Sequence, residues 1–153
     1  MAETTNQTVS SEYDDLKLEN QLCFPLYAAS REVVKQYTPY LKPLGLTYTQ
    51  YITLMVLWQE KKLRVGDLGH KLFLDTGTLT PLLKKMEEAG LVCRTRSAHD
   101  ERVVEVEITR KGMALREQLK DIPKQVGTCV KLSKEDARIL YRELYKMLEG
   151  FDD

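Results

Sequence analysis

Apolar residues recur every three or four positions through the middle of the chain, which is the spacing of one face of an α-helix. In residues 73–90 these apolar positions are Leu79, Leu82, Leu83 and Met86. Asp75 or Thr76 can cap the start of this helix, and Gly90 can end it. The opposite face and its flanks carry small, hydroxylated or charged residues: Gly77, Thr78, Thr80, Pro81, Lys84, Lys85 and Glu88. Such a face fits a DNA major groove, where threonine groups meet thymine methyls and base edges; a solvated face without a partner is the alternative.

Two short strands joined by a polar turn are predicted directly after this helix. Apolar and polar positions alternate in residues 102–108, residues 91–96 form the partner strand, and residues 97–101 form the turn. Upstream, residues 65–72 have the pattern of a short amphipathic helix, which completes a helix-turn-helix. The predicted fold is therefore mainly α with a small β-hairpin wing. Three arginines of the wing can reach phosphates or a narrow minor groove: Arg94, Arg96 and Arg102.

A long first helix is predicted to open near Asp14 or Asp15 and to continue to Tyr40 or Leu41. Its apolar residues occupy more of the helix surface than one small domain can cover by itself. Burial against a second copy of the chain is therefore the expected use of this helix.

Capping signals mark three further helices, which start at Thr47, Thr109 and Ser133. Thr47 with Gln50 has the spacing of a capping box, and the helix from Thr109 is expected to stop around residues 121–127. The predicted organisation is a disordered polar tail at residues 1–13 followed by a single domain at 14–153. Within it, a winged helix-turn-helix at about 47–109 is flanked by dimerisation helices at about 14–45 and 110–153.

Composition gives no global sign of a nucleic-acid partner. The 153 residues carry a formal net charge of zero, so any affinity for DNA must come from locally placed charge. No apolar run approaches the roughly 18 residues of a membrane span. No basic-then-apolar signal sequence is found at the N-terminus. We therefore expect a cytoplasmic protein without a membrane partner.

Cysteine and histidine residues do not form a metal-binding pattern. Cys23, Cys93 and Cys129 are an odd number in a chain without an export signal, so reduced thiols are expected. Neither these nor His70 and His99 stand at metal-ligand spacing, and no glycine-rich phosphate loop is found. We expect no metal and no cofactor, and we interpret Cys93 as a packed or idle thiol.

Cys23 is the main chemical candidate because tyrosines gather in the same quarter of the sequence. They are Tyr27, Tyr37, Tyr40, Tyr48 and Tyr51, five of the eight in the chain. Phenols can hydrogen-bond a thiolate and favour its charged form, and a thiolate can attack a peroxide O–O bond to give sulfenic acid. The alternative is a buried cysteine that acts as a small apolar side chain.

Two sequence blocks carry a resemblance to a known family. LGHKLFLDTGTLTPLLKKMEEAGLVCRTRSAHDER, residues 68–102, resembles the MarR family of winged-helix repressors. LENQLCFPLYAASREVVKQY at 18–37, with LTYTQY at 46–51, is similar to the organic-hydroperoxide-sensing branch of that family. The resemblance implies a homodimer that binds an inverted-repeat operator in double-stranded DNA, with a recognition helix at residues 76–88 and a wing built around Asp100. The implied DNA-binding residues are Asp75, Thr76, Gly77, Thr78, Thr80, Pro81, Lys84, Lys85, Arg94, Arg96 and Arg102.

The same resemblance implies the redox chemistry. The reactive cysteine of the family maps to Cys23, and its phenolic partners map to Tyr37 and Tyr48. In the two-cysteine members a second cysteine follows an Ile-Pro pair like Ile122–Pro123. This second cysteine maps to Cys129, and the resemblance implies that it is a resolving thiol that acts from the partner subunit. The implied function is a repressor, not an enzyme, that leaves DNA when an organic hydroperoxide oxidises Cys23. A regulator of this fold that senses another oxidant, a quinone or a phenolic ligand is the alternative, and a thiol peroxidase is a more distant one.

One position departs from the family pattern. Pro25 stands where similar sequences carry Leu or Ala, and proline removes an amide and disfavours a helical conformation at Phe24. Either the first helix kinks beside Cys23, or its regular part begins near Pro25 with proline in the first turn. The sequence leaves both possibilities open.

Overall fold

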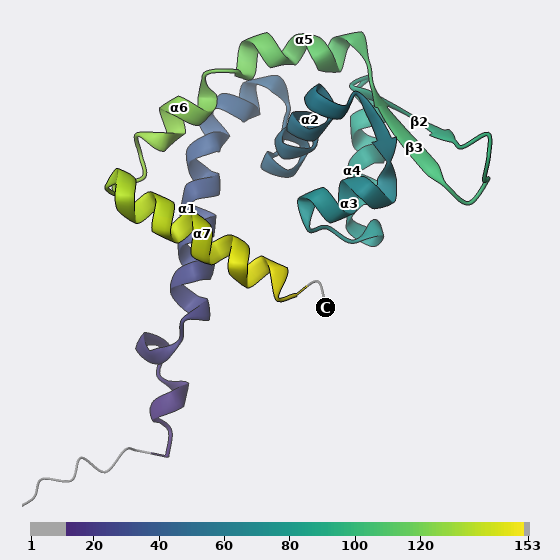
Figure 1. Ribbon diagram of the computed structural model, residues 1–153. Helices are drawn as coiled ribbons and strands as arrows, with labels where there is room; N and C mark the ends of the chain where they lie inside the picture. Colours follow the sequence, from purple (N-terminus) through teal and green to yellow (C-terminus); the bar gives the residue numbers. More distant parts are fainter. Residues whose placement is uncertain (1–11, 152–153) are drawn as a thin grey trace, which may run out of the picture. The chain divides into compact units, whose positions relative to one another are not determined.

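The computed structural model describes residues 12–151, so most of the predicted polar tail lies outside the described residues. Contacts along the chain separate two units, one ending at Lys35 and one beginning at Gln36. Each unit is described by itself. The predicted mainly α architecture with a small β wing is confirmed (Figure 1).

In the first unit the long helix begins later than the apolar pattern predicts. Short 3-10 turns at Asp14–Leu16 and Leu18–Asn20 precede helix α1, which covers Cys23–Leu41. The prediction of a helix opening at Asp14 or Asp15 is therefore wrong. Pro25 has no amide to donate to the Gln21 carbonyl, and proline is well tolerated in a first helical turn. The second of the two possibilities for Pro25 is the one that the structure adopts, with Cys23 as the first helical residue.

The second unit contains the helix-turn-helix and the wing. Its elements are α2 (Tyr48–Glu60), β1 (Lys62–Arg64), α3 (Val65–Leu72), α4 (Thr76–Glu88), β2 (Val92–Arg96), β3 (Val104–Ile108), α5 (Arg110–Leu119), α6 (Ile122–Gly127) and α7 (Lys134–Glu149). The Thr47–Gln50 capping box at the start of α2 is confirmed, and so are the caps of Thr109 on α5 and Ser133 on α7. Helix α5 ends at Leu119, so the predicted stop of this helix is confirmed. Residues 122–127 then form a separate short helix with Pro123 in its first turn, which was not predicted.

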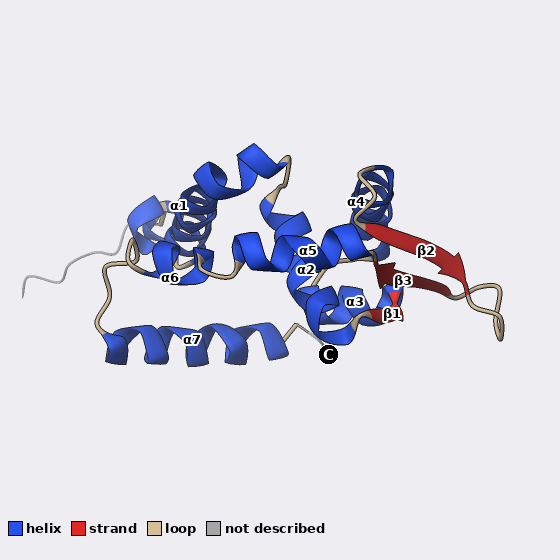
Figure 2. Cartoon of the chain, turned by 90° about the horizontal axis from the view of Figure 1, so that it is seen from above, coloured by secondary structure: helices blue, strands red, loops and turns tan. Residues whose placement is uncertain are grey.

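The predicted hairpin proves to be part of a three-stranded antiparallel sheet in the order β1-β3-β2. Strand β1 pairs with β3, with Leu63 opposite Val106, and it was not predicted. Strand β2 pairs with β3 from the other side, with Arg94 opposite Val106. Figure 2 shows the β2–β3 hairpin projecting beyond the helices of this unit. The wing is thus attached at its base through a strand that comes directly before the helix-turn-helix.

Helix α4 is held in place by the apolar face that its sequence predicts. Leu79, Leu83 and Met86 are buried, and Leu82 is half-buried. They belong to one core with residues of α2, α3 and the sheet, among them Leu54, Leu57, Leu68 and Val106. Packing on one face leaves the other face of α4 open to solvent. None of the described helices is long and apolar enough to cross a membrane.

The turn between α3 and α4 closes tightly on Gly69. The Leu74 N–H donates to the Gly69 carbonyl at 3.0 Å, and a Cβ at position 69 would lie 2.6 Å from the Leu74 carbonyl oxygen. We expect Gly69→Ala to lower the free energy of unfolding by about 2 kcal/mol, the usual scale of overpacking. Gly66→Ala, in the same helix but with open space at its Cβ, is the control and should leave stability equal or slightly higher. Equal urea midpoints for the two variants would contradict this account of the turn.

Candidate nucleic-acid interface

Helix α4 presents the predicted polar face to solvent. Exposed on it are Thr76, Gly77, Thr78, Thr80, Pro81, Lys84 and Lys85. Two of the threonine hydroxyls already donate locally: Thr78 Oγ1 to Asp75 Oδ2 at 2.9 Å and Thr80 Oγ1 to the Thr76 carbonyl at 2.8 Å. Because their hydrogens are used internally, these side chains offer methyl groups and acceptor lone pairs to an approaching partner.

Asp75 begins α4 as its N-cap. Its Oδ1 accepts the Thr78 N–H at 2.8 Å, and a Cβ at Gly77 would lie 3.0 Å from this oxygen. The hydrogen bonds from the Thr78 backbone and hydroxyl hold the pKa of the Asp75 carboxyl below its usual range. The cap is therefore fully effective above the ordinary aspartate pKa and is lost only as the pH falls through the lowered value. Asp75 orients the helix from its end, while its carboxylate faces the backbone of the first turn.

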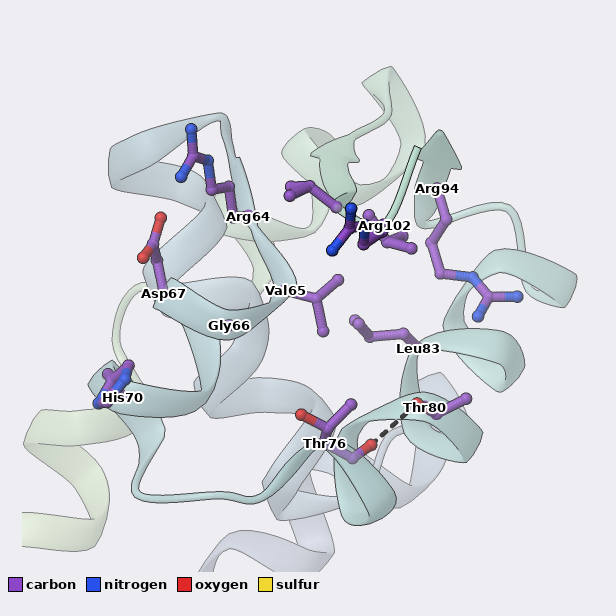
Figure 3. A pocket seen from close by; sticks show the side chains of 12 residues that line it. Arg64, Val65, Gly66, Asp67, His70, Thr76, Thr80, Leu83, Arg94 and Arg102 are labelled. Atoms are coloured by element: carbon purple, nitrogen blue, oxygen red, sulfur yellow. Dashed lines mark hydrogen bonds between the residues drawn. The ribbon is translucent and has the colours of Figure 1, made fainter. Parts of the chain in front are cut away.

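A hollow of about 480 Å³ lies between α3, α4 and the wing. Figure 3 shows Val65 and Leu83 pointing into it, with Thr76 and Thr80 along one side. Four groups that carry or can carry positive charge line it: Arg64, His70, Arg94 and Arg102. Arg64 and His70 were not among the predicted site residues, because neither lies on the recognition helix or the hairpin. Asp67 is the one acidic residue among those that line it, so the hollow combines an apolar floor with a mainly basic rim (Figure 3).

Two of the wing arginines lie at the exposed end of the hairpin. The Arg102 side chain is 95% exposed, and its backbone N–H donates to Asp100 Oδ1 at 3.0 Å. The Val103 N–H donates to the Asp100 carbonyl at 2.9 Å, so Asp100 closes the turn with both its side chain and its backbone. Arg96 Nη1 donates to the Glu101 carbonyl at 3.4 Å. The Arg102 Nε also lies 4.0 Å from Asp100 Oδ1, at the outer limit of an ion pair.

Arg94 is placed differently, because its guanidinium is engaged by Glu87 in the last turns of α4. Its Nε and Nη2 donate to Glu87 Oε2 at 3.1 and 2.9 Å, and its backbone N–H donates to Oε1 at 2.9 Å. The backbone N–H and then the guanidinium of Arg94 hold the pKa of Glu87 below its usual range. Sequence reasoning missed Glu87, since a carboxylate near a DNA-binding face carries no signal for DNA recognition.

Tyrosine rings meet where the end of α1 packs against α2, within the second unit. The ring centroids of Tyr37 and Tyr48 are 4.9 Å apart, and those of Tyr37 and Tyr51 are 5.7 Å apart. Burial raises the pKa of both Tyr37 and Tyr48, and burial with the neighbouring phenols raises the pKa of Tyr51 to about 12. The structure therefore brings together the two predicted phenols, Tyr37 and Tyr48, and keeps them protonated as hydrogen-bond donors at neutral pH.

Alkaline titration tests this tyrosine cluster. A raised phenol pKa in the fold contributes stability below the ordinary value near 10, and this contribution is lost as the pH rises from about 10 towards 12. We expect phenolate absorbance of the folded protein to include a component near pH 12 that is missing in Tyr51→Phe. The exposed Tyr13 supplies the matched control, because Tyr13→Phe should leave that component unchanged. Titration of all tyrosines near pH 10 in folded protein would contradict the burial of Tyr51.

All three cysteines are free and exposed in the single chain. Cys23 is the first residue of α1, so the alternative of a thiol buried within one chain does not hold. Cys129 lies in the turn after α6, with its Sγ 3.9 Å from the Gln125 carbonyl oxygen. Cys93 lies on β2 opposite Glu107 and is exposed, so its interpretation as a packed thiol is wrong. Within residues 12–151 there is no group of three or more Cys, His, Asp or Glu that could hold a metal ion.

Comparison with known proteins shows which family this chain resembles. The family model described as transcriptional regulator SarA/Rot matches residues 35–119. The organic hydroperoxide resistance transcriptional regulator of Bacillus subtilis is 48% identical over 141 residues, which cover 92% of this chain and 96% of the relative. The transcriptional regulator SarZ of Staphylococcus saprophyticus is 51% identical, covering 75% of this chain and 79% of the relative.

Solved structures give the same result for the fold. The structure of reduced AbfR bound to DNA has a TM-score of 0.75 and 32% identity, and the match covers 91% of this chain and 97% of that one. A structure of disulfide-formed AbfR matches with a TM-score of 0.64 and 32% identity, over 91% of this chain and 95% of that one. Relatives in sequence and neighbours in structure are transcriptional regulators.

Proposed function

The chain belongs to the SarA/Rot family of MarR-like winged-helix, DNA-binding transcriptional regulators, and we propose that it is an organic-hydroperoxide sensor within it. In this proposal a homodimeric repressor holds an inverted-repeat operator and leaves it when Cys23 is oxidised. The observation that carries the proposal is an exposed thiol at the start of α1 in a chain 48% identical to an organic hydroperoxide resistance regulator. We place the protein in the cytoplasm, where thiols are reduced and DNA is accessible.

The proposed DNA contacts start from the open face of α4. Its threonines, Pro81 and the two lysines would enter the major groove, and Arg102 and Arg96 would meet phosphates or the minor groove on either side. Arg64 and His70 add basic groups on the α3 side of the hollow. We leave Arg94 out of the contacting set because Glu87 already binds its guanidinium.

The homodimer is supported by apolar side chains that the single chain leaves in solvent. Helix α7 exposes Ile139, Leu140, Tyr141 and Tyr145, and α1 exposes several more: Phe24, Leu26, Val33 and Val34. Apolar groups on this scale on two terminal helices indicate an interface with another protein surface. A second copy would place two recognition helices in successive major grooves, roughly 34 Å apart along the duplex.

The proposed sensing step uses the Cys23 thiolate as the nucleophile. The thiolate attacks one peroxide oxygen, the O–O bond breaks, and sulfur gains a hydroxyl group as sulfenic acid. The other oxygen leaves as an alkoxide and takes a proton to become an alcohol. Sulfur is oxidised by two electrons and the peroxide is reduced by two, so no further reactant is needed.

Helix geometry determines whether Tyr37 of the same chain or Tyr37 of the partner subunit can hydrogen-bond Cys23. Cys23 and Tyr37 stand fourteen residues apart on α1, so about 1.5 Å per residue separates them by roughly 21 Å along one chain. A side-chain hydrogen bond cannot span that distance. We therefore propose that Tyr37 of the partner subunit donates to Cys23, with the two first helices antiparallel. A dimer structure with both copies of Tyr37 remote from Cys23 would refute this part of the proposal.

Replacement of the reactive thiol tests the sensor assignment. We expect Cys23→Ser to bind its operator with unchanged affinity and to remain bound after cumene hydroperoxide, because serine cannot form a sulfenic acid. Cys93→Ser, at the exposed thiol of the wing, is the matched control and should release DNA as the parent does. Gel shift on the promoter of the protein's own gene gives both results. Release of Cys23→Ser by the peroxide would remove Cys23 as the sensor, and release by a quinone or a phenol alone would favour the alternative regulator.

A further inference from the structure

We propose that Glu87 is a positioning residue for DNA binding: by holding Arg94, it fixes the wing against recognition helix α4. This inference rests on the proposed mode of DNA binding and adds a residue that touches no DNA. Glu87 lies on α4 near its C-terminal end, and Arg94 lies in strand β2 at the start of the wing. The pair therefore joins the two elements that have to enter neighbouring grooves.

Three hydrogen bonds make this joint stiff. Both carboxylate oxygens of Glu87 are used, one by the backbone N–H of Arg94 and the other by two nitrogens of its guanidinium. Simple surface ion pairs contribute little, but a carboxylate bonded at once to a strand backbone and to a forked guanidinium restricts both position and orientation. The side chains are only 36% and 26% exposed, which limits competition from water.

The joint acts on the whole hairpin because Arg94 is paired within it. Arg94 stands opposite the fully buried Val106 of β3, so a shift of β2 at this point carries β3 with it. The base of the wing is held separately: Thr109 Oγ1 donates to the Gly90 carbonyl at 2.7 Å, and Lys111 Nζ to the Ala89 carbonyl at 2.7 Å. Further along the wing, the Glu87 side chain connects α4 to strand β2 through its hydrogen bonds with Arg94. At about 3.3 Å per strand residue, a small rotation at Arg94 becomes a larger displacement of Arg102 at the tip.

Charge alone predicts the opposite role for Glu87. Its carboxylate is a negative charge close to the proposed path of DNA phosphates, and it neutralises Arg94. Removing it would subtract a repulsion and release a guanidinium, both of which strengthen binding to a polyanion. Positioning predicts weaker binding after the same change. The sign of the effect therefore separates the two roles.

The test compares Glu87→Ala with Glu88→Ala in the full-length protein. Both variants remove one carboxylate from the same turn of α4, but Glu88 is exposed, and within residues 12–151 no hydrogen bond or ion pair involves its side chain. Operator affinity is measured by fluorescence anisotropy at several salt concentrations. We expect Glu87→Ala to weaken binding about tenfold, the scale of substitutions that alter geometry without touching the ligand. The slope of log K against log salt should become flatter by about one, as for a lost phosphate contact. Glu88→Ala should bind as tightly as the parent or more tightly.

A double variant shows whether Glu87 acts through the wing. In an Arg102→Ala background the tip contact is already gone, so Glu87→Ala should cause little further loss. Thermal unfolding accompanies each measurement. Where Glu87→Ala is poorly folded, Glu87→Gln replaces it under the same criteria, because glutamine keeps an acceptor for the Arg94 N–H and loses the charged pair.

The outcomes are distinguishable from a failure of the proposed function. A parent protein that does not bind its promoter refutes the proposed function itself. A parent that binds, with Glu87→Ala binding as well as or better than Glu88→Ala, overturns the positioning role alone. Full additivity of the Glu87 and Arg102 substitutions would also overturn it, since it would mean that Glu87 does not act through the wing.

Discussion

Treatment with cumene hydroperoxide is expected to convert the protein into a disulfide-linked dimer through Cys23 and Cys129. A Cys23 sulfenic acid is attacked by the Cys129 thiolate, the S–S bond forms, and hydroxide leaves as water after taking a proton. Both thiols are exposed, and Cys129 lies in the turn between α6 and α7, where a bond to another subunit is sterically open. The bond requires Cα atoms closer than about 7 Å, so α7 must move if the reduced dimer holds them further apart. That movement would be the step that releases DNA.

Non-reducing electrophoresis checks this expectation. Peroxide-treated parent protein should run at twice the mass of the chain and return to one chain mass after dithiothreitol. The band should disappear in Cys23→Ser and in Cys129→Ser but persist in Cys93→Ser, whose thiol is equally exposed. A covalent dimer that survives Cys129→Ser would contradict the resolving role of Cys129. In that case the disulfide would join Cys23 to another protein thiol. Release of DNA by the peroxide without any covalent dimer would instead indicate a one-cysteine sensor that reacts with an external small thiol.

Arg102→Ala is expected to weaken operator binding about tenfold. The slope of log K against log salt should also become flatter by about one, because one phosphate contact is lost. The reason is the position of Arg102 at the tip of the wing, where its side chain is 95% exposed and its backbone is fixed by Asp100. Such an exposed guanidinium can neutralise a phosphate or enter a narrow minor groove. The weakening should be similar across operator sequences if the contact is to phosphate.

Arg116→Ala provides the matched control for this experiment. Arg116 is exposed on α5, away from α4 and the hairpin in sequence, and its removal changes the net charge by the same amount. Its binding curve should stay close to that of the parent at every salt concentration. Equal losses in the two variants would assign the effect to net charge, and unchanged affinity in Arg102→Ala would contradict the placement of the wing on DNA.

The recognition helix could be predicted because every local signal agrees there. The Asp75 cap, the apolar stripe from Leu79 to Met86 and the left-handed Gly90 all define the same helix, and the structure has each of them. Helix α2 could be predicted for the same reason, because Thr47 and Gln50 form its capping box. Signals within a few residues of one another are sufficient for elements of this kind.

Other features could not be predicted because distant or competing interactions decide them. Strand β1 has only three residues, and its partner in β3 lies more than forty positions later. The apolar stripe before Cys23 favours a helix, but the missing amide of Pro25 prevents it, and α1 begins only at Cys23. The Glu87–Arg94 pair depends on the angle of the wing, which no local pattern encodes. The family resemblance, and not a local pattern, predicted Tyr37 and Tyr48 as site residues. Packing of the end of α1 on α2 explains why their rings lie close together.

One measurement tests the central claim most directly: the affinity of the reduced protein for the promoter of its own gene, before and after addition of cumene hydroperoxide. The account predicts tight, salt-dependent binding to an inverted repeat by a dimer, release after oxidation, and recovery of binding after dithiothreitol. A reduced protein that binds the promoter no better than unrelated DNA, or a complex that is unchanged by the peroxide while free Cys23 is consumed, would contradict it.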